Sequence, residues 1–261
     1  MHLPKDIAYN FIEIGVNKTK LPPIKQFCLG IFAGIFIAFA GMSTVIASAS
    51  IENPSVARLI MALIFPGGLS MILLAGSELF TGNNLIIIPV LEKKVRVSAM
   101  LRNWVMVYLG NLTGSILTTC LLVYSHLPSM MDNLVADQLV MLAEGKLSLS
   151  FMDAFLRGIG CNILVCIAVW IAYAATTAPG KIISLYLPIV TFVLCGFEHC
   201  VADMFYIPAG ILTSVRYNIT AEGLTICRFL TANLVPVTLG NLIGGCFVVG
   251  FGYWFIYLRE D

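Results

Sequence analysis

Residues 103–114 read NWVMVYLGNLTG, and residues 233–244 read NLVPVTLGNLIG. Eight of these twelve positions are identical at an offset of 130 residues, which chance explains poorly. A weaker match relates the stretch Gly76-Ser-Glu78 to Gly196-Phe-Glu198. The two long stretches also share the small-residue spacing that lets helices approach closely, so a common packing motif is the alternative interpretation. We interpret the matches as an internal repeat, and the chain as two similar halves.

The composition around these stretches is that of a membrane protein. Hydrophobic residues make up 59% and charged residues 11% of the 261 positions, whereas soluble domains carry about 25% charged residues. The net charge of +1 argues against a nucleic-acid partner. Long apolar runs favour helices over barrel strands, whose residues alternate. Six apolar segments are expected to cross or enter a bilayer, at residues 26–50, 59–77, 103–128, 158–180, 182–197 and 229–258.

The second and fifth segments are each interrupted by polar residues. The second meets Glu78 and resumes at residues 85–91, and the fifth meets Glu198 and resumes at residues 204–212. We predict two helices broken near mid-membrane, with one kinked, tilted helix in each place as the alternative. Three segments per half is an odd number, so the second half should be inverted relative to the first. Inverted repeats with broken helices are typical of transporters and channels.

The distribution of Lys and Arg predicts that both termini are cytoplasmic. Residues 1–25 are expected to form a cytoplasmic N-terminal amphipathic helix. Residues 26–258 are expected to form the transmembrane channel domain, with repeats at about 26–128 and 155–258. A cleavable secretory signal is the less favoured interpretation of the first apolar run, which is too long for one.

Four ionisable side chains lie deep in the apolar segments, where they are costly and usually functional: Glu78, Glu198, His199 and Asp203. An imidazole can hold or release a proton near neutral pH, so His199 is the candidate to neutralise a permeating weak-acid anion. The alternative is a structural histidine bonded to loop backbone. The equivalent positions of Glu78 and Glu198 favour a supporting role, in which each accepts backbone N–H groups beside a break.

The remaining candidates are apolar rings and basic side chains. Lys25 and Lys146 could attract anions toward opposite mouths, or they could be ordinary surface lysines. The rings that could exclude water near the breaks are formed by Phe65, Leu69, Leu79, Phe80 and Phe192. The eight cysteines form no C-x-x-C pair, so neither a metal site nor another cofactor is expected.

These motifs together resemble the formate/nitrite transporter family. The resemblance rests on Gly76-Ser-Glu-Leu-Phe-Thr-Gly-Asn83, on Gly196-Phe-Glu-His199 and on Leu239-Gly-Asn-Leu-Ile-Gly-Gly245, and it covers residues 5–258. It implies an aquaporin-like fold of six helices and a homopentamer with one pore in each protomer. It also implies that Thr81 faces His199 in the pore, beside Asn162, with the apolar rings on both sides. Formate and nitrite members usually carry Asn where this chain has Asp203.

The sequence therefore predicts an inner-membrane channel or proton-coupled carrier for small monovalent weak-acid anions, and not an enzyme. Formate is the first expectation, hydrosulfide the second and nitrite the third. An aquaporin-like water facilitator should carry paired Asn-Pro-Ala motifs, which are absent. A metal enzyme using Glu78, Glu198, His199 and Asp203 and a receptor without transport are the remaining alternatives.

Overall fold

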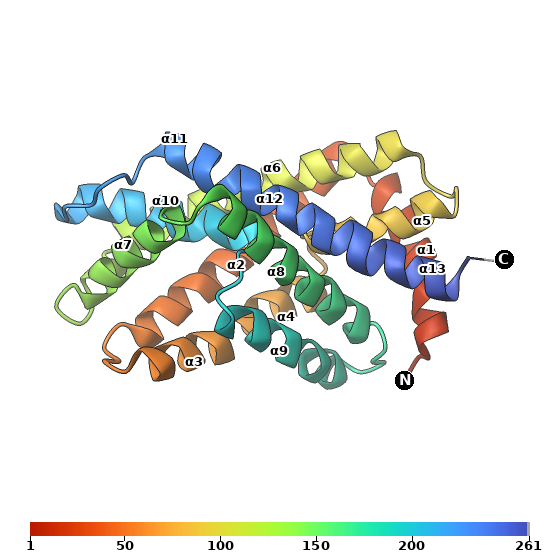
Figure 1. The fold of residues 1–261 in the computed structure, drawn as a ribbon, viewed down its shortest axis with the longest axis horizontal. Helices are drawn as coiled ribbons and strands as arrows, with labels where there is room; N and C mark the ends of the chain where they lie inside the picture. The colour runs from red at the N-terminus through yellow and green to blue at the C-terminus, as the bar shows by residue number, and fades with distance from the viewer. Residues whose placement is uncertain (260–261) are drawn as a thin grey trace.

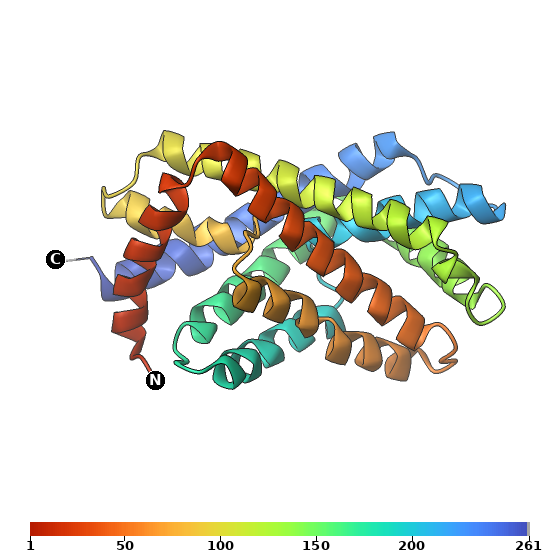
Figure 2. The same ribbon diagram turned by 180° about the vertical axis from the view of Figure 1, so that it is seen from behind.

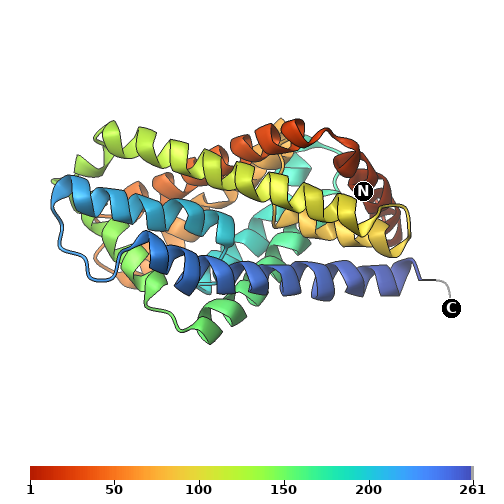
Figure 3. The ribbon, with the colours of Figure 1, turned by 90° about the horizontal axis from the view of Figure 1, so that it is seen from above.

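The computed structural model describes residues 1–259, all of which are helical or irregular, with no strand among them. Long helices run along the molecule and cross at shallow angles (Figures 1 and 3). Five of the described helices are long and apolar enough to cross a membrane. They are α2 (Pro23–Ser48), α3 with α4 (Pro54–Ile64 and Pro66–Ala75), α6 (Val97–Tyr124), α8 (Phe151–Ala172) and the run α11–α13 (Ile226–Tyr257).

The second and fifth apolar segments have shorter helices. After α4, the chain turns at Gly76 with a φ of +78° and continues as η1 (Gly82–Ile86) and α5 (Ile87–Leu91). Helix α9 (Ala178–Leu194) is followed by Gly196, with a φ of +66°, and by α10 (Cys200–Tyr217). Glycine adopts such positive φ values without steric cost. Both segments therefore leave irregular backbone in the middle of the molecule.

Two helix pairs hold these irregular stretches between them, because α2 packs along α6 and α8 packs along α12 (Val235–Leu242). A methyl group at Gly110 would lie 2.9 Å from the Cα atom of Gly30. A methyl group at Gly240 would lie 3.0 Å from the Cα atom of Gly158. The two repeated stretches thus supply glycines at the closest backbone approach of each pair.

Two short helices lie at opposite ends of the molecule. Helix α1 (Pro4–Lys20) lies beside α13, whereas α7 (Leu134–Leu147) lies at the far end (Figures 1 and 2). Helix α7 lies between the third and fourth apolar segments, where the sequence predicts no helix. Four other short pieces complete the fold: η2 (Leu127–Ser129), α11 (Ile226–Arg228), η3 (Phe229–Leu234) and η4 (Ile243–Phe251), before α13 (Gly252–Tyr257).

The helices extend beyond the charge-free runs from which the segments were predicted. Helix α6 begins at Val97 and includes Arg102, and α8 begins at Phe151 and includes Asp153 and Arg157. Charged side chains are tolerated at helix ends because they reach water beyond the apolar layer. The length of a charge-free run is therefore shorter than the helix that contains it, here at the N-terminal ends of α6 and α8.

Candidate functional site

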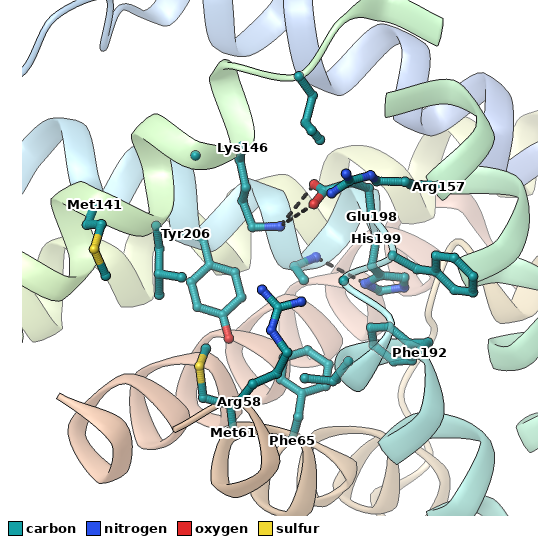
Figure 4. Close-up of a pocket in the computed structure, with 17 residues that line it drawn as sticks. Arg58, Met61, Phe65, Met141, Lys146, Arg157, Phe192, Glu198, His199 and Tyr206 are labelled. Atoms are coloured by element: carbon teal, nitrogen blue, oxygen red, sulfur yellow. Dashed lines mark hydrogen bonds and ion pairs between the residues drawn. The ribbon is translucent and has the colours of Figure 1, made fainter. Parts of the chain in front are cut away.

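Two cavities lie on opposite sides of the irregular backbone. The larger has a volume of about 260 Å³, and its walls include Arg58, Lys146 and Arg157 (Figure 4). The smaller has a volume of about 30 Å³, and its walls include Lys18 and Asn83. Because Lys146 belongs to α7 and Lys18 to α1, the cavities lie toward opposite ends of the molecule. The residues between them are candidates for the barrier of a pathway.

His199 and Thr81 meet between the two irregular stretches. The His199 ring caps the first turn of α10, where Nδ1 accepts the backbone N–H of Ala202 at 3.1 Å. The other ring nitrogen, Nε2, lies 2.8 Å from the Thr81 hydroxyl. Since Nδ1 is the acceptor, the hydrogen of the neutral ring belongs on Nε2 and is donated to Thr81 Oγ1. The Thr81 hydroxyl hydrogen then remains for another acceptor.

Asn162 joins the Thr81 loop to the second half of the chain. Its side-chain N–H group donates to the Thr81 carbonyl at 3.3 Å, to Asn84 Oδ1 at 2.7 Å and to the Asn241 carbonyl at 2.7 Å. Asn162 has no exposed surface. It therefore supports the backbone around the Thr81–His199 contact, and within residues 1–259 its side chain makes no hydrogen bond to either side chain of that pair.

Apolar side chains adjoin this contact on both sides. The Phe65 and Phe192 rings meet edge to face with centroids 5.6 Å apart, and the Phe192 centroid lies 6.1 Å from that of His199. Both phenylalanines line the larger cavity (Figure 4). Leu69 and Leu79 line the smaller cavity.

Phe80 lies apart from the other four apolar side chains. It lines neither of the two cavities and packs against Tyr108 and Trp104, with ring centroids 4.8 Å and 6.3 Å away. These rings border an apolar groove on the outer face of the molecule. The structure therefore brings Phe65, Leu69, Leu79 and Phe192 to the cavities and places Phe80 elsewhere.

An ion cluster supports each irregular stretch. In the first half, Lys18 Nζ lies 2.8 Å from Glu78 Oε1 and donates to Asn83 Oδ1 at 3.0 Å. In the second half, Lys146 Nζ lies 2.9 Å from Glu198 Oε2 and 2.7 Å from Asp203 Oδ1.

Both glutamates are buried, and a buried carboxylate is tolerated only when a charge or several donors satisfy it. The two clusters therefore pair the same residue types, lysine with glutamate. They differ in the third residue, which is Asn83 in the first cluster and Asp203 in the second.

Two asparagines from the repeated stretches satisfy the backbone at the breaks. Asn111 Oδ1 accepts the N–H of Phe80 at 2.9 Å, and Asn241 Oδ1 accepts the N–H of Cys200 at 3.0 Å. The equivalent positions of Glu78 and Glu198 had predicted that these two residues satisfy the backbone. Within residues 1–259, however, their carboxylates accept hydrogen bonds from side chains only. The repeated Leu-Gly-Asn-Leu motif was the signal for Asn111 and Asn241.

The basic residues at the larger cavity differ from those expected. Lys146 lines it but is held by two acidic groups, while Arg58 and Arg157 line it with no carboxylate within 4 Å in the described part of the chain. Arg58 Nη1 lies 3.5 Å from the Leu194 carbonyl, at the C-terminal end of α9. Lys25 is exposed and lines neither cavity, and the lysine beside Glu78 is Lys18.

Metal-binding side chains do not gather at this site. Over residues 1–259, no group of three or more His, Cys, Asp or Glu side chains is arranged to hold a metal ion. The polar groups that reach the larger cavity are instead a neutral imidazole, the Tyr206 hydroxyl, basic side chains and one carboxylate, Glu198, which is paired with Lys146. Such groups can bind a small anion through hydrogen bonds and positive potential.

A sequence profile of the formate/nitrite transporter family matches residues 5–255. The chain belongs to the formate/nitrite transporter family. Family membership makes it a membrane-spanning transport protein, in agreement with the helices described above. A curated member, the formate channel FocA of Escherichia coli K12, is 35% identical over 99% of this chain and 95% of its own length.

Solved structures of the family share the fold. A pentameric formate channel with formate bound is 34% identical, with a TM-score of 0.81 over 91% of this chain and 98% of that one. An ion channel of the family with 24% identity has a TM-score of 0.86 over 96% of this chain and 98% of that one, which is a likeness of fold. The predicted family resemblance and the all-helical membrane fold are confirmed.

Proposed function

We propose that the protein conducts small monovalent weak-acid anions across a membrane, as a channel or with a coupled proton, and that formate is its first substrate. The observation that carries the proposal is the Thr81–His199 contact of 2.8 Å beside the Phe65–Phe192 pair. The relatives named formate channels are the reason why formate is proposed first, with hydrosulfide and nitrite as the alternatives. All three anions are small and can be protonated, so the experiment below compares the uptake of each.

The anion reaches the barrier through the larger cavity, where Arg58 and Arg157 supply positive potential. At the inner end of that cavity, Phe65 and Phe192 exclude water, which removes the hydration that stabilises an anion. A hydrogen bond from the Thr81 hydroxyl offsets part of this cost. His199 Nε2–H donates to Thr81 Oγ1 and so polarises the same hydroxyl.

Proton transfer can follow the same path. Transfer requires the positively charged ring, because loss of the Nε2 proton from a neutral ring would leave an imidazolate anion. When both ring nitrogens carry a proton, Nε2 gives its proton to Thr81 Oγ1, the anion takes the Thr81 hydroxyl proton and the anion leaves as its neutral acid. The ring is then neutral and regains its second proton from water on either side, or the proton travels onward with the substrate. Full protonation of the ring at Nδ1 requires Ala202 to give up its hydrogen bond to that atom, so the neutral ring is the resting state.

The proposed membrane arrangement has six spans in two inverted halves, with α9 and α10 together as the fifth. It is supported by residues that make equivalent contacts in the two halves, such as Asn111 and Asn241. It is also supported by the position of the first and last helices, α1 and α13, at one end of the molecule (Figures 1 and 2).

The basic residues near the N-terminus and in the loop between α5 and α6 support a cytoplasmic location for that end, and the inner membrane is the proposed location of the protein. We propose α1 as the cytoplasmic amphipathic helix preceding the channel domain.

A homopentamer is the proposed assembly, as in the pentameric formate channel of similar fold. The outer groove between α6 and the α11–α13 run is lined almost wholly by apolar side chains, including Leu101, Val105 and Leu239. Such a face requires either lipid or another protein surface in contact with it.

The decisive experiment measures uptake of formate, nitrite and hydrosulfide into proteoliposomes containing the purified protein, at two pH values. We expect formate uptake to be fastest and to rise as the pH falls, because the neutral acid crosses the apolar barrier. Equal uptake of all three anions without pH dependence would contradict a protonation step, and absence of uptake of any would contradict the transport function itself.

A further inference from the structure

The two ion clusters can be compared atom by atom, because each consists of one lysine, one glutamate and one residue five positions after that glutamate. In the first cluster, this third residue is Asn83, whose Oδ1 accepts from Lys18 at 3.0 Å. In the second cluster, it is Asp203, whose Oδ1 lies 2.7 Å from Lys146 Nζ. The oxygens that face the lysines are therefore equivalent, and the difference between the clusters lies in the other side-chain atom.

That other atom is a donor in the first cluster. Asn83 Nδ2 donates to Glu78 Oε2 at 2.6 Å and to Asn103 Oδ1 at 2.9 Å. In the second cluster the same place is taken by Asp203 Oδ2, which is fully buried and has no hydrogen-bond partner within residues 1–259. An ionised carboxylate has no hydrogen to donate there.

Asn233, which contacts Glu198, also has an acceptor that lacks a donor. Asn233 stands in the second repeated stretch where Asn103 stands in the first. Its Oδ1 is buried without a partner in the described part of the chain, while its Nδ2 lies 3.4 Å from Glu198 Oε2. A hydrogen on Asp203 Oδ2 would take the place of the amide hydrogens of Asn83, whose acceptors Glu78 and Asn103 have Glu198 and Asn233 as their equivalents. A carboxylic acid has nearly the same shape as the amide it would imitate.

The charge balance leads to the same conclusion. Lys18 and Glu78 neutralise each other in the first cluster, whereas Lys146 faces two carboxyl groups in the second. Two carboxylates that share one cation in a buried site cannot both stay ionised cheaply. No second basic side chain of residues 1–259 pairs with them. The other titratable groups near Asp203 are Tyr108 on α6, Cys161 on α8, and Cys200 and Tyr206 on α10.

We propose that Glu198 and Asp203 together bind one exchangeable proton, held on Asp203, and that this site controls anion access to the larger cavity. The first half has no counterpart, since an amide cannot release its hydrogen in this way. The route for the proton runs through Glu198, which lines the cavity, whereas Asp203 has no exposed surface. The effect on transport rests on the proposed function, but the proton site itself does not.

Release of this proton to water in the cavity leaves a net negative charge beside Lys146. That charge opposes the potential of Arg58 and Arg157, which line the same cavity. Anion access should therefore decrease as the pH rises through the titration of the pair. This decrease in anion access adds to any effect of pH on the protonation of the substrate itself. It affects only anions that enter through the larger cavity.

Infrared difference spectroscopy of the purified protein tests the proton site without transport. We expect a carboxylic-acid C=O band at neutral pH that shifts in D₂O and is lost in Asp203→Asn, because a single glutamate paired with Lys146 stays ionised. Asn83→Asp is the matched control, and it should gain a second such band in the first cluster. Absence of the band from the wild-type protein, or its persistence in Asp203→Asn, would overturn the proposal.

Proteoliposome uptake tests the effect on access. The ratio of Asp203→Asn uptake to wild-type uptake should increase with pH, because only the wild-type site gains negative charge. A ratio that is independent of pH would overturn control of access by this site. If neither protein transports any anion, the proposed function fails, while the infrared result still decides whether the proton site exists. Asp203→Asn gives the second cluster the same third residue as the first. If this variant does not fold, absence of the band from the wild-type spectrum would still overturn the proposal.

Discussion

His199 contributes to this structure through both of its ring nitrogens. Nδ1 closes the first turn of α10, and Nε2 makes the contact with Thr81. The two alternatives left by the sequence, a proton donor and a structural histidine, are therefore not exclusive at the level of geometry. A substitution that removes the whole ring confuses the two roles, because loss of the helix cap can alter the site without any change in proton chemistry.

Replacement of His199 by Asn and by Ala separates these roles. Asn can accept the backbone N–H of Ala202 as an N-cap residue, whereas Ala cannot, and loss of a cap costs about 1 kcal/mol. We expect His199→Ala to have the lower unfolding temperature of the two variants, by a few degrees. Both should lose the pH-dependent uptake of formate, because neither has an Nε2 hydrogen to polarise Thr81. Wild-type uptake in His199→Asn would contradict a role of the ring in transport.

At the scale of helices, the repeated stretches determine how the two halves are built. Gly110 and Gly240 allow close helix contacts, and the adjacent Asn111 and Asn241 reach the irregular backbone that those contacts surround. Each asparagine also donates to one carbonyl group of the break and to one of the long helix beside it: Glu78 and Gly30 for Asn111, Glu198 and Gly158 for Asn241. In each half, the same Leu-Gly-Asn-Leu motif therefore provides both the close helix contact and the hydrogen bonds to the irregular backbone.

A methyl group added at one of these contacts should be destabilising. Gly240→Ala forces α8 and α12 apart, and overpacking of this kind costs about 1–3 kcal/mol. Gly145→Ala is the control, because a methyl group there meets no atom within 4 Å and replaces glycine within helix α7, which stabilises by about 0.5–1 kcal/mol. Thermal unfolding in detergent should therefore shift in opposite directions for the two variants. Equal shifts would contradict the contact.

The sequence predicted the all-helical membrane fold because long apolar runs leave few alternatives. It did not predict α7, since a short amphipathic helix between two long ones lacks the apolar length that identifies a span. Lys18 was missed beside Glu78 because the partner comes from a different helix, and sequence distance carries no information about that contact. Arg157 was missed because it lies directly before a charge-free run and so served only as a boundary.

At the scale of the whole molecule, the two cavities differ in charge. The larger contains Arg58 and Arg157 in addition to a lysine that is paired with acidic groups. The equivalent of Arg157 in the first half is Leu29, since the carbonyls of these two residues accept the N–H groups of Glu198 and Glu78. The added arginine therefore belongs to one face of the protein, and anions should be attracted more strongly from that side.

Neutralisation of these arginines tests the asymmetry. We expect the double variant Arg58→Gln/Arg157→Gln to lower formate uptake at low substrate concentration by about fivefold. This corresponds to a loss of about 1 kcal/mol of electrostatic attraction between the cavity and the anion. High salt should reduce the difference, because it screens exposed charges. Arg216→Gln, a charge on α10 that lines neither cavity, is the control. A loss of the same size in that control would indicate a general effect of net charge.

The lysine of the first cluster, Lys18, belongs to α1, and that of the second, Lys146, belongs to α7. These two lysines are 128 positions apart in the sequence. The unit that occurs twice in this chain therefore includes the short helix that precedes each set of long segments. A gene duplication explains this best if the ancestral gene encoded the whole unit, lysine included. Such an ancestor already carried its own ion cluster, and two copies inserted in opposite orientations could have assembled as a dimer before fusion joined them into one polypeptide.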